Sequence, residues 1–304
     1  MQIDVIGPEI EAKLDWLVLT EAFIAGHSRA RAEVADVILR NGPDTLLNRS
    51  AWIEGVGIAV KAATIFPHNP ERHGQAAING LVAVMSAEDG RLEALLDFGM
   101  VTKWKTAADS LLAARLLARP DATEFLIVGA GAVARSMVTA YGAAFPAARF
   151  SVWARDPAAA RRFADETGAR PEDDLEKAVR RAEVIATTTM ATAPLIKGEW
   201  LAPGTHLDLI GAYRADMREV DSDCFRRGSV FVDSRATTIG HIGELMAPLA
   251  EGAISEGDIR ADYYDLPSGR FRRNTPEEIT LCKNGGGAHL DLMTARYMIQ
   301  AAAS

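Results

Sequence analysis

The sequence has few cysteines, no long apolar run and no excess of positive charge. Its 304 residues include two cysteines, Cys224 and Cys282, whose spacing fits neither a metal site nor a redox pair. So few cysteines are typical of a reducing compartment. We therefore predict a cytoplasmic protein without a metal. The first residues lack a basic stretch followed by an apolar core, so no signal peptide is predicted.

Nucleic acid and membranes are not expected partners. No apolar run reaches the roughly 20 residues that span a bilayer. The formal net charge of −8 opposes a general attraction to nucleic acid or to anionic lipid. The 48% hydrophobic and 24% charged residues are ordinary for a globular protein, and the length allows two domains.

A glycine turn after residue 128 is the most informative feature. Phe125–Val128 is a short apolar run, and a G-x-G-x-x-A pattern and a helical segment follow it directly. This strand, turn and helix are typical of a dinucleotide-binding fold. Gly129 permits the tight turn, Gly131 lets a pyrophosphate approach the backbone, and Ala134 lets the helix pack closely. Free N–H groups at the helix start favour the phosphates. A purely structural glycine turn is the alternative.

From this turn onward, strand and helix patterns alternate. Short apolar runs at 151–153, 184–186, 207–210 and 230–232 predict buried strands, and Asp156 can cap a helix at 157–166. The alternation predicts an α/β fold with a Rossmann-type doubly wound parallel sheet.

The two ends of the chain have another character. We expect helices at 14–25 and 29–39, then antiparallel sheet with a hairpin at 88–90, and a helix at 106–117. A strand at 279–282 and a helix at 290–302 close the chain. Residues 1–120 and 263–304 are therefore predicted to form an α+β domain for dimerisation and substrate binding. Residues 121–262 are predicted to form the Rossmann domain.

The end of the second Rossmann strand bears on the choice of nicotinamide cofactor. An acidic residue at this point would bind the ribose hydroxyls of NAD, but the sequence has Ala154 and then Arg155. Arg155 can pair with the 2′-phosphate of NADP, while Asp156 is already used as a helix cap. We therefore favour NADP(H), with NAD(H) as the alternative. Arg155 as a simple solvated loop residue is the other interpretation.

Three cations in the first part of the chain have the chemistry to bind a carboxylate or a phosphate. They are Arg49, Lys61 and Lys105. Lys61 lies inside an otherwise apolar strand pattern, where a lone lysine is more often a solvated edge residue. The residues alone do not show that the three converge.

The chain resembles the ornithine cyclodeaminase/μ-crystallin family over nearly its whole length. The matching pieces occur in the family's order and are Asn48–Arg49, Val60–Lys61 with Pro67–Pro70, Thr102–Ser110, Val128–Ala132, Ala186–Thr189, Leu209–Tyr213 with Met217–Glu219, and Lys283–Asp291. The resemblance implies a homodimer with a Rossmann domain on each subunit. It also implies that Arg49 and Lys61 hold a substrate carboxylate near the nicotinamide. We take Lys61 as the candidate catalytic residue, with a bound water as the alternative source of the proton. Lys105 is implied at both the substrate and the cofactor phosphates. The expected cofactor-binding residues are Lys105, Gly129, Gly131, Ala132, Val133, Arg155, Thr188, Thr189, Ile210 and Asn284.

Two positions depart from the cyclodeaminase pattern. That pattern has an aspartate, which handles the substrate amine, followed by Pro-Gly-Lys; this chain has Tyr213 and Met217 at the aspartate and lysine positions. A neutral tyrosine stabilises an ammonium far less well than a carboxylate. We therefore predict an NAD(P)H-dependent reductase of a small cyclic imino acid, 1-pyrroline-2-carboxylate or 1-piperideine-2-carboxylate. Its product would be L-proline or L-pipecolate. The alternatives are an ornithine cyclodeaminase, an amino-acid dehydrogenase, and a non-catalytic μ-crystallin-like NADPH-binding protein.

Overall fold

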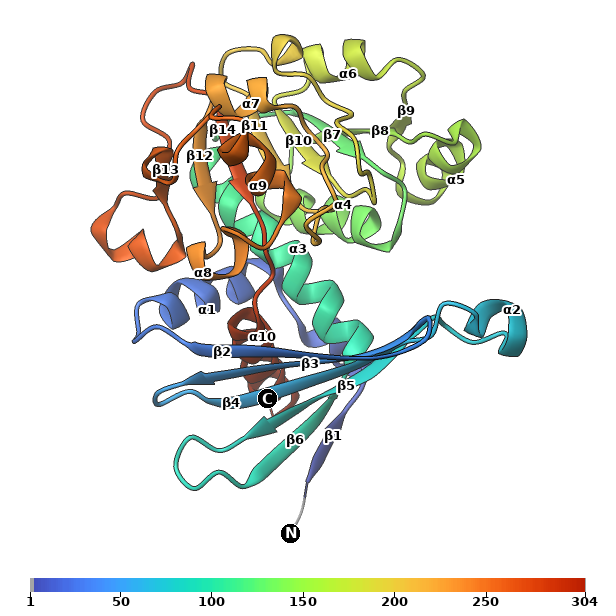
Figure 1. Cartoon of the computed structure of the whole chain (residues 1–304), viewed down its shortest axis with the longest axis vertical. Coiled ribbons are helices and arrows are strands. Elements are labelled where there is room, and N and C mark those ends of the chain that lie inside the picture. Colours follow the sequence, from blue (N-terminus) through green and yellow to red (C-terminus); the bar gives the residue numbers. More distant parts are fainter. Residues whose placement is uncertain (1–2, 304) are drawn as a thin grey trace. The chain divides into compact units, whose positions relative to one another are not determined.

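The computed structural model describes residues 3–303 and divides into two compact units (Figure 1). The first unit runs up to Lys105 and resumes at Gly286, and the second unit is Thr106–Gly285. The chain thus leaves the first unit, builds the second and returns. Residues 1, 2 and 304 of the predicted first domain lie outside the described residues.

The first unit is built on a six-stranded sheet. Its strands are β1 (Asp4–Ile6), β2 (Glu33–Asn41), β3 (Asp44–Ile53), β4 (Gly57–Ile65), β5 (Ile78–Met85) and β6 (Leu92–Asp97). The strand order is β1-β6-β5-β4-β3-β2, antiparallel except for the parallel pair of β1 and β6. The predicted antiparallel sheet and the hairpin between β5 and β6 are confirmed.

The helix expected at 29–39 is wrong, because this segment is strand β2. Asn41 pairs with Asp44, and Gly42 adopts a φ of 57° in the two-residue turn between them. Such a turn joins two antiparallel strands, whereas the Asn-Gly pair also resembles a helix stop in the sequence. Pairing with β3 along the full strand then outweighs the helical spacing of the apolar residues.

One face of this sheet is covered by helices. Helix α10 (Ala288–Ala303) contacts β3, β4 and β5 and also packs on α1 (Trp16–His27), as Figure 1 shows. Asp15 caps α1 by accepting hydrogen bonds from the N–H groups of Leu17 and Val18. The other helical segments of this unit are η1 (Pro8–Lys13), α2 (Asn69–His73) and the first turns of α3 (Phe98–Leu117).

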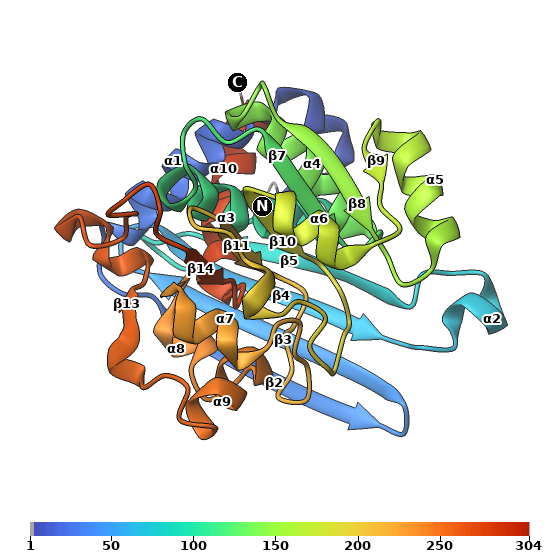
Figure 2. The same ribbon diagram turned by 90° about the horizontal axis from the view of Figure 1, so that it is seen from above.

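The second unit is a Rossmann-type parallel sheet with helices (Figure 2). Its strands are β7 (Glu124–Val128), β8 (Arg149–Trp153), β9 (Arg170–Pro171), β10 (Val184–Thr187), β11 (His206–Leu209), β12 (Ser229–Val232), β13 (Ile259–Ala261) and β14 (Thr280–Lys283). They are all parallel, in the order β13-β12-β14-β11-β10-β7-β8-β9. The predicted fold class is confirmed.

The helices of the second unit follow the strands. They are α4 (Ala132–Ala144), α5 (Pro157–Thr167), α6 (Leu175–Arg181), α7 (Ser222–Arg227), α8 (Arg235–Thr238) and α9 (Gly243–Ala250), with short 3-10 turns η2 (Gly198–Trp200), η3 (Glu256–Asp258) and η4 (Tyr263–Ser268). Asp156 caps α5 as predicted, and Gly168 ends it with a φ of 76°.

The two units do not begin and end at the predicted domain boundaries of 121 and 262. Strand β14 lies between β11 and β12 and is hydrogen-bonded to both. The chain up to Gly285 therefore belongs to the parallel sheet. Among residues 3–303, no helix is both long and apolar enough to cross a membrane.

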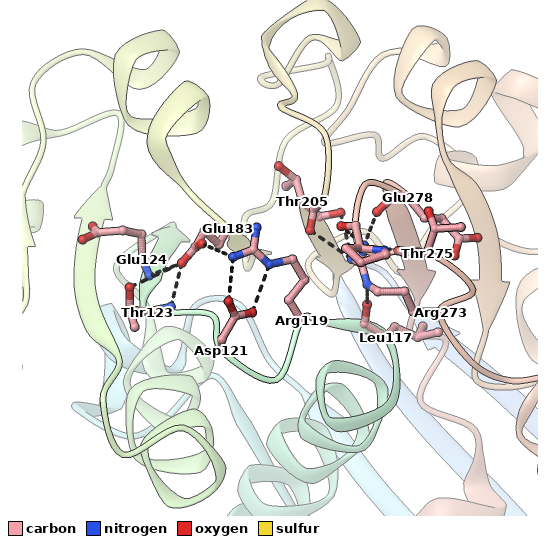
Figure 3. Close-up of polar contacts among 12 residues, drawn as sticks. Leu117, Arg119, Asp121, Thr123, Glu124, Glu183, Thr205, Arg273, Thr275 and Glu278 are labelled. Atoms are coloured by element: carbon pink, nitrogen blue, oxygen red, sulfur yellow. Dashed lines mark hydrogen bonds and ion pairs between the residues drawn. The ribbon is translucent and has the colours of Figure 1, made fainter.

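The amino ends of the parallel strands are held together by a polar network (Figure 3). Glu183 accepts hydrogen bonds from the backbone N–H groups of Thr123, at 2.7 Å, and Glu124, at 3.1 Å. Arg119 pairs with Glu183, and Arg273 donates to backbone oxygens of several neighbouring segments. The predicted cofactor-binding residues Thr188, Thr189 and Ile210 follow the opposite, carboxyl ends of these strands.

Candidate active site

The sheet of the first unit brings two of the predicted cations together. Arg49 on β3 is directly opposite Lys61 on β4, and Asp36 on β2 continues the same row. Directly opposed residues of antiparallel strands project from the same face of the sheet. On this face Val82 of β5, next to Lys61, is fully buried. The strand register therefore places both cations on the side that carries the core.

Lys61 is a buried member of an ion pair. Its Nζ donates to Oδ1 of Asp291, in α10, at 2.9 Å. Lys61 is 6% exposed and Asp291 is 1% exposed. The ammonium also lies 4.8 Å from the centre of the Phe98 ring. The interpretation of Lys61 as a solvated edge residue is therefore wrong, because the side chain is held inside the unit by charge and ring contacts.

Lys105 and Arg49 meet at one backbone carbonyl. Lys105 Nζ donates to the oxygen of Gly286 at 3.1 Å, and Arg49 donates to the same oxygen at 2.8 Å. Gly286 adopts a φ of 64°, which favours glycine, and a Cβ there would meet Lys105 Nζ at 2.6 Å. The glycine loop is thus the point where two of the predicted substrate-binding cations converge.

The charges in this cluster shift one another's protonation. Burial lowers the pKa of Lys61 to about 8, a shift that Asp291 opposes and that the positive charges of Lys105 and Arg49 increase. Burial acts to raise the pKa of Asp291, but Lys61, Lys105 and Arg49 together hold it below its usual value. Asp291 is therefore ionised at neutral pH, and the pKa of Lys61 lies closer to neutral pH than that of an exposed lysine.

Cations outnumber carboxylates among the side chains named in this cluster. Three cations, Arg49, Lys61 and Lys105, stand against two carboxylates, Asp291 and Asp36, the latter 3.0 Å from Arg49. Arginine and lysine hydrogen-bond carboxylates well, so this arrangement has the chemistry to bind a small carboxylic acid.

The predicted phosphate-binding turn of the second unit has the expected shape. Gly129 has a φ of 115°, and a Cβ at this position would collide with Thr188. A Cβ at Gly131 would meet nothing within 4 Å, so the space in front of this residue is open. Gly131 precedes α4, whose first residues Ala132 and Val133 present the helix N-terminus. This turn fits the diphosphate of a dinucleotide.

Asn284 also fits a bound cofactor. It directly follows β14 and is 6% exposed, and its side-chain amide has no hydrogen-bond partner within the described part of the chain. A buried amide of this kind is costly unless a ligand or water satisfies it. Its backbone N–H donates to Leu209 O, which keeps the loop beside the end of β11.

The remaining predicted cofactor residues lie after successive strands. Thr188 and Thr189 follow β10, Ile210 follows β11, and Arg155 follows β8. The carboxyl ends of parallel strands share one edge of a sheet, which is where such folds bind their ligands. Arg155 is exposed and forms no ion pair with residues 3–303. These roles remain predictions, since placement alone does not test them.

The two positions that depart from the cyclodeaminase pattern have different surroundings. The Tyr213 side chain is 57% exposed, whereas Met217 is fully buried and packs with Ala212 and Ile242. A lysine at 217 would carry its charge into an apolar cluster, which is costly. The buried Met217 therefore agrees with a site that lacks the cyclodeaminase lysine.

The sequence did not single out two residues that organise these sites. Asp291 and Glu219 are both inside pieces that match the family, but neither was assigned a role. Their signal in the sequence is weak, because Glu219 is one of several charged residues in its segment and Asp291 is an isolated acidic residue after a glycine-rich loop. A buried carboxylate needs partners, but the partners of Asp291 lie far away along the chain.

Three comparisons with known proteins agree with this arrangement. The model of the "Ornithine cyclodeaminase/mu-crystallin family" matches residues 51–304. The chain is 48% identical over 293 residues to a Delta(1)-pyrroline-2-carboxylate reductase of Paracoccus denitrificans, covering 94% of this chain and 92% of that protein.

Two solved structures resemble the whole chain. One is the Delta(1)-pyrroline-2-carboxylate reductase of Thermococcus litoralis in complex with NADH and L-proline, with a TM-score of 0.89, 25% identity, and coverage of 99% of this chain and 98% of that chain. The other is an archaeal alanine dehydrogenase dimer with bound NAD, with a TM-score of 0.89, 25% identity, and coverage of 100% and 97%.

Proposed function

This chain belongs to the ornithine cyclodeaminase/mu-crystallin family, and we propose that it is an NAD(P)H-dependent reductase of a small cyclic imino acid. The substrate is 1-pyrroline-2-carboxylate or 1-piperideine-2-carboxylate, and the product is L-proline or L-pipecolate. The observation that carries the proposal is the convergence of Arg49, Lys61 and Lys105 into one cluster around Asp291 and the Gly286 carbonyl. A relative 48% identical to this chain bears the name of such a reductase.

The carboxylate of the substrate binds to the cation cluster. Arg49 and Lys61 provide donors from neighbouring strands of a rigid sheet, so the anion is held in one orientation. Asp291 fixes the Lys61 side chain by the 2.9 Å ion pair. Lys105 adds charge from α3. Positioning is the main contribution of these residues to the reaction.

A reduced nicotinamide, when bound, supplies the hydride for the imine carbon. Lys61 donates a proton to the ring nitrogen of the imine. This favours the reaction because a protonated imine accepts a hydride more readily than a neutral one. With a pKa of about 8, Lys61 is mostly protonated at neutral pH and loses its proton more easily than an exposed lysine. After the transfer, the ring nitrogen has become an amine and the ring carbon carries one new hydrogen.

The preferred cofactor is NADPH. The exposed guanidinium of Arg155 forms no ion pair with residues 3–303, and Arg155 is the second residue after β8, where it can meet a 2′-phosphate. The next residue, Asp156, accepts a hydrogen bond from the N–H of Ala158 at 2.9 Å as a helix cap. The solved relatives named above contain NADH or NAD, so NADH is the cofactor against which this preference is tested.

The protein forms a homodimer through the uncovered face of its antiparallel sheet. Val37 of β2 and Leu81 of β5 lie in one cross-strand row on the face opposite Lys61, and they are 52% and 42% exposed. Exposed apolar rows on a sheet are typical of an interface. We expect Val37→Glu to produce monomers in sedimentation, whereas Val18→Glu on α1 leaves the dimer intact. The reaction takes place in the cytoplasm, where the two free thiols stay reduced.

The function is tested with the purified full chain and a panel of acids. Oxidation of NADPH is followed with 1-pyrroline-2-carboxylate, 1-piperideine-2-carboxylate, and pyruvate with ammonia. Turnover of a cyclic imine supports the proposal. Fast turnover of pyruvate with ammonia alone would indicate an amino-acid dehydrogenase, the activity named for one solved relative. Binding of NADPH without any oxidation would indicate a non-catalytic binding protein.

A further inference from the structure

One buried carboxylate joins two loops that carry predicted cofactor contacts. Glu219 is fully buried and lies in the segment between β11 and α7. Both of its carboxylate oxygens are used, one for each loop. We infer that Glu219 is the positioning residue that fixes the loops after β10 and β11 for the nicotinamide cofactor. This inference rests on the proposed function.

The first oxygen of Glu219 holds the loop after β10. Oε1 accepts hydrogen bonds from the backbone N–H and from the hydroxyl of Thr189, both at 2.7 Å. Thr189 and its neighbour Thr188 are among the predicted cofactor contacts. The backbone of this loop is thereby tied to a charged acceptor, which forms stronger hydrogen bonds than a neutral one.

The second oxygen holds the loop after β11. Oε2 accepts hydrogen bonds from the N–H groups of Gly211, at 2.8 Å, and Ala212, at 3.2 Å. The hydroxyl of Thr187, at the end of β10, adds a bond of 2.7 Å. Ile210 immediately precedes this loop and Tyr213 immediately follows it. The Glu219 carboxylate thus fixes the backbone between Ile210 and Tyr213.

The loops after β10 and β11 lie so close together that a glycine is needed at position 211, and Glu219 is hydrogen-bonded to both loops. A Cβ at Gly211 would collide with the backbone of Thr189 and with Glu219 Oε1. On the other side, the Thr188 hydroxyl donates to the oxygen of Val128 at 3.1 Å, directly before the glycine turn. The ends of β7, β10 and β11 are therefore connected through one chain of hydrogen bonds. A second carboxylate, that of Glu244, accepts a hydrogen bond from the backbone N–H of Glu219 at 2.7 Å and supports it.

Position 219 requires a carboxylate because hydrogen-bond donors face both of its oxygens. Five donors, three of them backbone N–H groups, point at its two oxygens. A glutamine has one acceptor oxygen and one NH₂ group, which would face donors of one loop or the other. Buried N–H groups would then lose their partner, which is costly. The loop would move away, although the rest of the sheet would be unchanged.

The experiment compares Glu219→Gln with a matched variant at the other edge of the same sheet. Glu183→Gln removes a carboxylate that also accepts from two backbone N–H groups, those of Thr123 and Glu124 (Figure 3). Glu183 directly precedes β10, whereas Thr188 and Thr189 follow its other end. The dissociation constants of NADH and NADPH are measured by fluorescence titration, and thermal unfolding is measured for each variant. Binding of pyrrole-2-carboxylate, a flat acid that cannot be reduced, reports on the cation cluster.

We expect Glu219→Gln to raise the dissociation constant of the cofactor about tenfold or more, as for the loss of a charge-assisted hydrogen bond. Binding of the acid is expected to change less than about twofold, because the side-chain hydrogen bonds of Glu219 go to β10 and to the loops after β10 and β11. Glu183→Gln is expected to lower the melting temperature and to leave cofactor binding unchanged. Thr187→Val keeps the charge and removes one bond to Glu219, so it is expected to weaken cofactor binding by a smaller factor, even if Glu219→Gln does not fold.

Unchanged cofactor binding in both Glu219→Gln and Thr187→Val would overturn the inference. Equal weakening by Glu219→Gln and Glu183→Gln would also overturn it, since this is the result of a general loosening of the sheet. If the unaltered protein bound no nicotinamide cofactor, the proposed function itself would fail. The two failures are thus separated by the measurement on the unaltered protein.

Discussion

Lys61 and Asp291 form a buried ion pair of 2.9 Å, although 230 positions separate them in the sequence. Lys61 is on a central strand of the antiparallel sheet, and Asp291 is in the first turn of the last helix. A lone lysine in a strand is usually solvated. Here the Asp291 carboxylate keeps the ammonium inside the unit, beside the other two cations of the cluster.

Replacing Asp291 with asparagine is therefore expected to impair catalysis and stability together. Loss of one partner of a buried pair leaves an uncompensated charge. We expect kcat/KM for the imine to fall about 10- to 100-fold, together with a lower melting temperature. Asp36→Asn is the control, because Asp36 is 42% exposed and its pair with Arg49 contributes little. Equal effects of the two substitutions would contradict a special role for the buried pair.

Arg49 and Lys61 are expected to be the strongest contributors to substrate binding. Each substitution to alanine should cost about 2–5 kcal/mol in kcat/KM, as for loss of one partner of a desolvated charge pair. Steady-state kinetics with the cyclic imine measures this. Arg29→Ala, a change elsewhere in the same unit, serves as a control. Near-normal kcat/KM in Lys61→Ala would refute the assigned role of Lys61.

The pH dependence follows from the lowered pKa of Lys61. Burial lowers this pKa to about 8, so the ammonium is present below that pH and is lost as the pH rises above it. Binding of pyrrole-2-carboxylate is expected to weaken above about pH 8, by up to tenfold per pH unit. This acid has no ionisation of its own near pH 8, so the profile reports on the protein. A flat profile up to pH 10 would mean that Lys61 is not the titrating group.

Asp291→Asn provides a second check of the same assignment. The negative charge of Asp291 raises the pKa of Lys61 against the effect of burial. Removing this charge should therefore move the loss of acid binding to lower pH. A shift in the opposite direction would contradict the proposed electrostatics.

Features set by neighbouring residues could be predicted from the sequence. The turn at Gly129, the Asp156 cap and the hairpin between β5 and β6 each depend on a few consecutive residues. The strands of the parallel sheet are short apolar runs, and their alternation with helices indicated the fold class.

Features set by distant pairing could not be predicted in the same way. Strand β2 has apolar residues at helical spacing, and only its pairing with β3 makes it a strand. Asp291 and Glu219 acquire their roles from partners in other elements. The family resemblance indicated which cations matter, but the convergence of Arg49 and Lys61 follows from the register of β3 and β4.

Cofactor selectivity is expected to depend on Arg155. If its guanidinium binds the 2′-phosphate, Arg155→Ala should raise the KM for NADPH about tenfold and change that for NADH little. Arg161→Ala, in the neighbouring helix α5, is the control. Equal effects on both cofactors, or a preference of the unaltered protein for NADH, would overturn the proposed preference for NADPH.

The last prediction is that the protein reduces a cyclic imino acid but does not cyclise ornithine. Cyclisation needs a group that manages the charge and the protons of the substrate amine, and the family's cyclodeaminase pattern uses an aspartate and a lysine near it. In this chain Tyr213 is an exposed phenol, and Met217 is buried in an apolar cluster. Neither can replace the carboxylate or the ammonium.

Reduction needs less from the protein: an anchored carboxylate, a protonated imine and a bound reduced cofactor. The cluster of Arg49, Lys61 and Lys105 provides the first of these. The assay follows ammonia and proline from ornithine with NAD, beside the loss of NADPH with 1-pyrroline-2-carboxylate. We expect imine-dependent oxidation of NADPH and no ammonia above the background. Robust release of ammonia without imine reduction would show that other residues manage the amine and that Tyr213 does not mark a reductase.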